Sequence, residues 1–149
     1  ATSISFTTGT AGLTNGQNVR ILVTNPDGNA ARSSSDLVVS DGPVFQTTSL
    51  PNGESNTAYS QNIDVTGDSA VTIGTSVVSG ALPAGITIGS TTNPSGSTYR
   101  AVISGTMPTI TSTTVYSFTV RATDAQGQTT DQALSITSTA GIGNSGGFC

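Results

Sequence analysis

The chain has 149 residues, of which only 8% are charged, and its formal net charge at pH 7 is -4. Soluble domains ordinarily carry about 25% charged residues, so Ser, Thr, Asn, Gln and Gly must provide most of the polar surface. The 4 cations are arginines scattered along the sequence, which excludes the clustered positive charge that nucleic-acid binding requires. No apolar run approaches the roughly 20 residues that cross a membrane as a helix.

Alternation of apolar and polar residues near the N-terminus predicts two strands. Ile4 and Phe6 share one face of a strand over residues 2–6, and a second strand is predicted over residues 19–23. A disordered chain is the rival interpretation for a composition so rich in Ser, Thr and Gly. Disorder does not produce repeated period-2 alternation, so we expect a folded β-protein.

The sequence Asn-Pro-Asp-Gly at residues 25–28 predicts a turn after the second strand. Pro26 presets φ there, and Gly28 is free to take a positive φ. The chain is therefore expected to turn back, with the returning strand at residues 35–39.

Asp41, Gly42 and Pro43 interrupt this pattern. Pro cannot donate to a strand ladder and Gly carries no side chain to pack. We therefore expect a domain boundary, with a small partial β-domain at residues 1–42 and a second domain at residues 43–138. The chain starts at Ala1 rather than Met, which predicts a processed product or a piece of a longer protein.

Seven short strands with turn signals between them are predicted in the second domain, the number found in a β-sandwich. The clearest alternation places Tyr116, Phe118, Val120 and Ala122 on one face, which should point toward the core. The predicted strands lie at residues 44–47, 58–65, 70–78, 85–88, 98–104, 115–123 and 131–137.

Three segments of this domain carry a family resemblance: LPAGITI at residues 82–88, ISGT at 103–106 and YSFTVRATDAQGQ at 116–128. They resemble an immunoglobulin-like family of bacterial and phage surface proteins, which has an LP.G turn, an SGT step and a Y.FTV.ATD..G strand and turn. The resemblance implies an all-β, immunoglobulin-like β-sandwich. The matching positions are Leu82, Pro83, Gly85, Ser104 to Thr106, Tyr116, Phe118 to Val120, Ala122 to Asp124 and Gly127.

Residues 1–42 resemble the second half of another immunoglobulin-like module, the IPT/TIG type of transcription-factor and receptor ectodomain repeats, through VRILVTNPDGNAARSSSDLVVS. A full sandwich needs about twice this length, so the first domain is predicted to be partial. It is a truncated domain, a small sheet packed on its neighbour, or a sandwich completed by strands of another chain.

No catalytic arrangement is evident. The chain has 0 His residues, which removes Ser-His-Asp and Cys-His sites. Two carboxylates alone serve glycosidases, but Asp27, Asp68 and Asp124 lie in predicted turns, where Asp caps its own backbone. We expect no enzymatic activity.

Asp124 in the sequence ATDAQG also resembles the calcium-binding turn of cadherin repeats. Calcium takes about six to eight oxygen ligands, usually with several converging carboxylates. The companion acidic motifs of cadherins are absent, and the boundary offers only Asp36 and Asp41. A structural turn is therefore preferred, with calcium as the alternative and no other cofactor expected.

For each tyrosine a structural role is preferred to a ligand-binding role. Tyr116 stands two residues before Phe118, the spacing of a corner tyrosine whose hydroxyl bonds to nearby backbone. Tyr59 and Tyr99 lie at the rim of the core or form a platform for carbohydrate stacking. Sugar binding is disfavoured because the chain has 0 Trp residues and aromatic faces usually make that contact.

The Gly-rich tail at residues 139–149 ends in two residues suited to assembly. Cys149 is the 1 cysteine of the chain, so it is a free thiol or an intermolecular disulfide. Phe148 is a candidate apolar anchor on a partner subunit. The alternative is a terminus without a functional partner.

Together these features predict a non-catalytic structural or adhesive module at a virion surface or cell surface. A phage virion protein, such as a capsid decoration, neck or tail-fibre component, is the preferred interpretation. The first alternative is a bacterial adhesin or a filament subunit completed by strand exchange, with Ile4 and Phe6 on the donated strand. The second is an accessory carbohydrate-binding domain of an exported enzyme. The expected partners are protein subunits, or glycans in the last case, and neither nucleic acid nor membrane.

Overall fold

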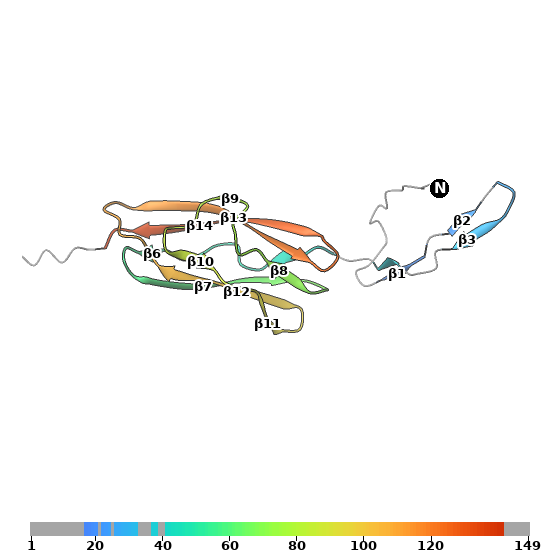
Figure 1. Cartoon of the computed structure of the whole chain (residues 1–149), viewed down its shortest axis with the longest axis horizontal. Helices are drawn as coiled ribbons and strands as arrows, with labels where there is room; N and C mark the ends of the chain where they lie inside the picture. The colour runs from blue at the N-terminus through green and yellow to red at the C-terminus, as the bar shows by residue number, and fades with distance from the viewer. Residues whose placement is uncertain (1–16, 21, 25, 33–36, 39–40, 142–149) are drawn as a thin grey trace, which may run out of the picture. The chain divides into compact units, whose positions relative to one another are not determined.

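The structure is a computed structural model that describes residues 17–20, 22–24, 26–32, 37–38 and 41–141 (Figure 1). It consists of two compact units, Ala1–Asp41 and Gly42–Cys149. Every regular element of the described residues is a β-strand. The predicted all-β class is confirmed.

The first unit contains two small antiparallel pairs. β1 (Asn18–Val19) pairs with β4 (Leu37–Val38), and β2 (Leu22–Thr24) pairs with β3 (Ala30–Arg32). The predicted turn joins β2 to β3, and Gly28 has a φ of 89°. Asp27 stabilises this turn, because its Oδ1 accepts a hydrogen bond from the backbone N–H of Asn29 at 3.2 Å.

The strand that returns first from this turn is β3, and not the predicted strand at residues 35–39. The tight turn places Thr24 directly opposite Ala30, so pairing resumes at once. Ala30 and Ala31 give little sequence signal because alanine is depleted in strands. The described part of the predicted strand, β4, pairs with β1 instead.

The described strands of the first unit bury little apolar surface. Leu22 and Val23 point to opposite faces of β2 and are 53% and 39% exposed. The predicted strand at residues 2–6 lies outside the described residues.

The second unit is a sandwich of two five-stranded sheets, which Figure 1 shows as two layers. In the β7–β12 sheet the strands are β5 (Val44–Phe45), β7 (Ala58–Thr66), β10 (Ile86–Ile88), β11 (Thr92–Ser95) and β12 (Thr98–Thr106). In the β13–β14 sheet they are β6 (Gly53–Glu54), β8 (Val71–Ile73), β9 (Ser79–Gly80), β13 (Thr114–Asp124) and β14 (Thr129–Thr139). The β6–β14 pair is parallel and the others are antiparallel.

The core lies between these sheets and uses alternate residues of each long strand. On β13 the predicted inward residues Phe118, Val120 and Ala122 are buried, and Tyr116 at the strand's end is half-buried. The predicted immunoglobulin-like sandwich is confirmed. The buried apolar residues are Phe45, Tyr59, Ile63, Val65, Val71, Ile73, Ile86, Ile88, Ala101, Ile103, Met107, Phe118, Val120, Ala122, Leu134 and Ile136.

Short edge elements account for the differences from the predicted strands. The strand expected at residues 70–78 ends at Ile73, and the chain then loops beside β13 before it forms β9. Backbone bonds from Gly74 to Arg121 and from Val78 to Thr119, both 2.8 Å, hold this loop. β6, β9 and β11 have two to four residues each, too short for a period-2 pattern to reveal.

Two of the sequence motifs meet at one close backbone contact. Ile86 pairs with Gly105, which brings Gly85 of the LP.G turn against Gly105 of the SGT step. A Cβ on Gly105 would overlap the carbonyl oxygen of Gly85. Gly105 also has a φ of 148°, which L side chains rarely adopt. The motif therefore specifies how closely β10 approaches β12.

We expect Gly105→Ala to lower the free energy of unfolding by about 3 kcal/mol, since strain and overlap act together. Gly127→Ala is the matched control, because Gly127 has a φ of 84° but nothing within 4 Å of an added Cβ. Its loss should be about 1 kcal/mol. Denaturant unfolding of both variants measures the difference, and equal losses would contradict the role of the Gly85 contact.

Candidate functional site

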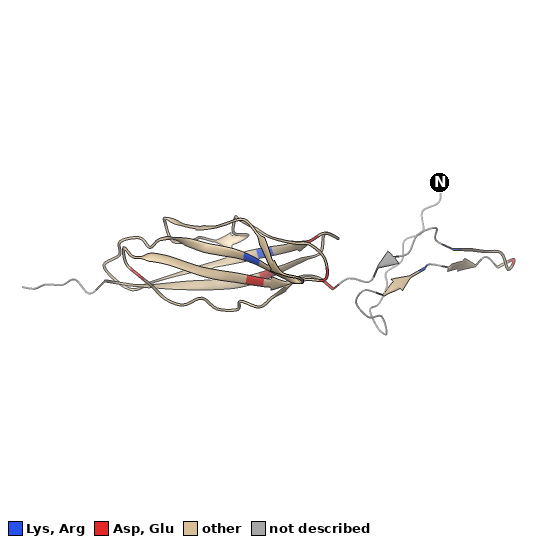
Figure 2. Cartoon of the chain, turned by 90° about the horizontal axis from the view of Figure 1, so that it is seen from below, with Lys and Arg blue, Asp and Glu red and all other residues tan. Residues whose placement is uncertain are grey.

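Two arginine–aspartate pairs lie on the second unit, one on each sheet. Arg100 on β12 faces Asp64 on β7, with Nε to Oδ1 at 2.6 Å and the second nitrogen to Oδ2 at 2.8 Å. Arg121 on β13 faces Asp131 on β14 in the same bidentate manner, at 2.7 and 2.8 Å. Figure 2 shows these blue and red positions side by side. Each pair joins directly opposite residues of neighbouring strands, so it fixes register.

The charged groups of these two pairs are bound to each other, so they are not available for catalysis. The hydrogen bonds from Arg100 hold the pKa of the Asp64 carboxyl below its usual value, although partial burial opposes the shift. Arg121 lowers the pKa of Asp131 in the same way. Both carboxylates therefore stay ionised and bound near neutral pH, the opposite of a general acid, which needs a raised pKa.

Asp124 caps the turn between β13 and β14, as predicted. Its Oδ1 accepts hydrogen bonds from the backbone N–H groups of Gln126 at 2.9 Å and Gln128 at 2.7 Å. The side chain is buried, with 6% of the residue exposed, and Oδ2 has no hydrogen-bond partner. Within the described residues no group of three or more His, Cys, Asp or Glu side chains could hold a metal ion. The observed bonds are those of a structural turn.

Among the described residues, the tyrosine whose hydroxyl bonds to the backbone is Tyr59 rather than Tyr116. Tyr59 is 6% exposed, and its hydroxyl donates a hydrogen bond to the Pro51 carbonyl at 2.9 Å. Burial raises its pKa. The spacing argument for Tyr116 missed this, because the inward register of β7 carries Tyr59 into the core beside the chain that leads to β6.

Tyr59 is therefore not available as a platform for carbohydrate stacking. Tyr99 is partly buried against the core and lines a hollow of about 360 Å³ between β8 and β11. The other lining residues are Val71, Thr72, Ile73, Thr75, Ser90, Thr91, Thr92 and Asn93. The exposed aromatic row that the carbohydrate interpretation predicts therefore cannot include Tyr59, whereas Tyr99 is half-buried and lines this hollow.

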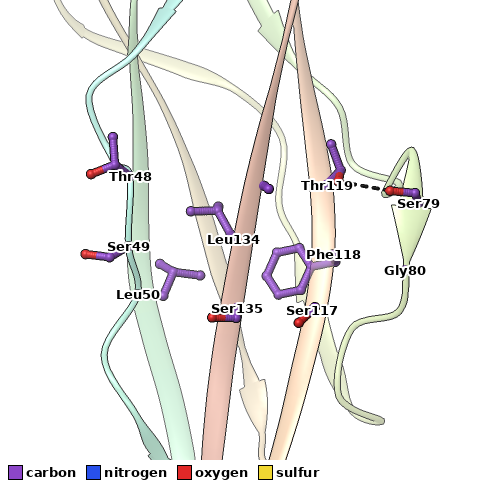
Figure 3. Close-up of a pocket in the computed structure, with 11 residues that line it drawn as sticks. Thr48, Ser49, Leu50, Ser79, Gly80, Ser117, Phe118, Thr119, Leu134 and Ser135 are labelled. Carbon is purple, nitrogen blue, oxygen red and sulfur yellow. Dashed lines mark hydrogen bonds between the residues drawn. The ribbon is translucent and has the colours of Figure 1, made fainter.

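A second hollow, of about 470 Å³, lies along β14 and β13 (Figure 3). Leu50 and Leu134 lie between the chain at residues 48–50 and β14. Phe118 is the third large apolar side chain of the lining, which otherwise has Ser, Thr, Ala and Gly. The hydroxyls of Ser79 and Thr119 bond to each other at 2.9 Å. The hollow is neutral, with no side chain that could act as nucleophile activator or proton donor near pH 7.

The residues predicted as assembly contacts, Ile4, Phe6, Phe148 and Cys149, lie outside the described residues. Sequence reasoning did not identify the hollow along β14. The alternation at residues 131–137 predicts a strand, but nothing in it indicates a hollow beside that strand.

These features define an immunoglobulin-like β-sandwich with a sparsely charged surface and a turn capped by Asp124. The sequence profile of a family described as "Putative Ig domain" matches residues 42–139, more than half of the 149-residue chain. The chain belongs to this family, which supports a structural or adhesive module in general and is typically non-catalytic. No curated protein matches the chain significantly. No described helix is long and apolar enough to span a membrane.

We expect the Asp64–Arg100 pair to make stability depend on acid pH. The folded-state pKa of Asp64 is lowered from an unfolded value of about 3.9. The pair therefore stabilises the fold above that pH, and the contribution is lost as pH falls through the folded-state pKa. Asp64→Asn should lower the free energy of unfolding by less than about 1 kcal/mol at neutral pH.

Urea unfolding at several pH values measures this difference between wild type and D64N, which should shrink on acidification. Asp131→Asn is the matched control, since its pair is more exposed, at 46% and 41% against 36% and 25% for the side chains. Its effect should be the smaller. A D64N difference that grows in acid would refute the assignment.

Asp124→Ala should lower the free energy of unfolding by about 1 to 3 kcal/mol, because two backbone N–H groups lose their acceptor. Calcium should not change the melting temperature of wild type, if the carboxylate only caps the turn. Calorimetry with calcium or with a chelator tests this. A melting temperature that rises with calcium in wild type, and not in D124A, would establish the cadherin-like alternative.

Proposed function

We propose that this protein is a structural module of an extracellular assembly, and that the assembly is a phage virion. It would serve as a capsid decoration, neck or tail-fibre component, with other protein subunits as its partners. The family supports the general statement of a structural or adhesive module. The virion is the proposed setting.

The sparsely charged surface of the sandwich is the observation that carries this proposal. Enzymes gather titratable groups with perturbed pKa values in a cleft. Here Arg100 and Arg121 are each bound to an aspartate across neighbouring strands, and the hollows along β14 and beside Tyr99 are lined without any charged residue. Such a surface suits contact with other subunits over a wide area rather than chemistry at one point.

Two other settings remain candidates. A strand-exchanged filament subunit or bacterial adhesin is the first, since in the described part of the chain the side of β14 away from β13 pairs only with β6, at Ser138 and Thr139. An accessory carbohydrate-binding domain has less support, since Tyr59 is buried and bonded to Pro51.

The virion proposal predicts that the protein is part of released particles. Antibodies against the second unit should label purified virions in electron micrographs, at regular positions set by the symmetry of the capsid, neck or tail. Preimmune serum is the control for the particles, and intact uninfected cells are the control for the setting. Labelling of the cell surface without labelling of particles would replace the virion with an adhesin.

A further inference from the structure

We propose that the hollow between β8 and β11 binds a neutral glycan, with the ring of Tyr99 as the face on which a sugar stacks. The inference goes beyond the structural role proposed above, and it does not depend on the virion setting. It rests on the position of Tyr99, the fixed rim of the hollow and the absence of charge from its lining.

Tyr99 is the aromatic residue that lines this hollow. It lies on β12 and is half-buried, so packing against the core holds the side chain while part of it stays exposed. Among the described residues its hydroxyl has no hydrogen-bond partner, whereas the hydroxyl of Tyr59 is bonded to Pro51. A tyrosine held in this way offers a rigid contact surface that loses little conformational entropy when a ligand binds.

Hydrogen bonds of the segment at residues 91–93 hold the rim of the hollow in place. The Thr91 hydroxyl accepts a hydrogen bond from the backbone N–H of Ile73 at 2.8 Å and donates one to the carbonyl of the same residue at 3.3 Å. The side-chain amide of Asn93 donates to the Gly96 carbonyl at 2.9 Å, which leaves its oxygen as an acceptor. The hollow is therefore largely preformed, as small-ligand sites usually are.

The other polar side chains of the lining are uncharged. Thr72, Thr75 and Ser90 are exposed, and each hydroxyl can both donate and accept a hydrogen bond. Arg100, which follows Tyr99 on β12, does not line the hollow and is bound to Asp64. A charged ligand would lose hydration here without gaining an ion pair, so the lining favours a neutral ligand.

A sugar ring fits this combination better than a peptide does. Its C–H face packs on an aromatic ring, and its hydroxyls exchange hydrogen bonds with those of the protein. A proline-rich peptide would need a groove lined by several aromatic residues, and this lining has Tyr99 alone. The volume of about 360 Å³ lies at the lower end of the roughly 300 to 1,000 Å³ of small-ligand sites, enough for about one or two sugar rings.

The other described aromatic residues do not offer such a face. In the hollow along β14 (Figure 3) the aromatic residue is Phe118, which is 2% exposed and cannot stack on a sugar. Phe45 and Tyr59 are buried, and Tyr116 lines neither hollow. Tyr99 is therefore the described aromatic residue that combines an exposed part with a hollow beside it.

A single tyrosine in an open hollow predicts weak binding by one copy, with a dissociation constant of about 1 mM. Many copies on one particle or surface raise the effective affinity by about 10² to 10⁴, without any new contact. The glycan should therefore be sought with the protein displayed in many copies.

The test displays the full chain in many copies on fluorescent beads and measures their binding to an array of neutral and anionic glycans. Wild type should bind one or more neutral glycans. Tyr99→Leu keeps an apolar side chain against the core but removes the flat ring, so it should weaken binding at least about tenfold. Tyr99→Phe keeps the ring and should retain binding. Tyr116→Leu is the matched control, because Tyr116 is also half-buried, and it should bind like wild type.

Thr75→Glu is a second variant, which decides the question if Tyr99→Leu does not fold. Thr75 is exposed, so the added carboxylate occupies the hollow without disturbing the core, and binding should be lost. Ser49→Glu is its matched control, since Ser49 is exposed at the hollow along β14 and the charge change is the same.

Three results would overturn the inference. They are a wild type that binds no neutral glycan, binding that persists in both Tyr99→Leu and Thr75→Glu, and controls that weaken binding as much as these variants do. Virion labelling does not depend on glycan binding, so the two proposals fail separately.

Discussion

The apolar layer shared by the two sheets is the constraint on which the rest of the second unit depends. Ile63, Val65 and Ile103 from one sheet, and Val120 and Ile136 from the other, are completely removed from solvent. Burial of this surface is the main favourable contribution to folding. Every second residue of each long strand lies in this layer. The residues between them face solvent, where Ser and Thr keep the outer faces hydrated without charge.

The scarcity of charge also shapes how the protein can meet its neighbours. Proteins with abundant lysine place it on exposed strand edges, where it prevents unwanted pairing. This chain has no lysine, and in the second unit two of its arginines, Arg100 and Arg121, are bound to aspartates in the middle of sheets. The strand edges of the sandwich therefore carry no lysine, and other parts of the chain must cover or shorten them.

The sequence predicted the parts of the fold that repeat with a period of two, and missed those specified by single contacts. Alternation around Phe118 located β13 and its inward face, and the motif at Asp124 predicted its turn. Nothing local distinguished Tyr59 from Tyr116 as the tyrosine that bonds to backbone, because the position of Pro51 depends on how the chain crosses between sheets. The hollow along β14 was hidden for the same reason, since Leu50 and Leu134 meet only after folding.

The parallel pairing of β6 with β14 has a mechanical consequence. The second unit begins at Gly42, which lies beside Gln128 and Thr130 at the start of β14, and the strand ends at Thr139. Tension applied through these two points would run along β14, so the bonds linking Gly53 and Ser55 to its last residues would be loaded in shear. Bonds loaded in this direction must break together rather than one after another. The sandwich is therefore arranged to resist stretching between Gly42 and Thr139.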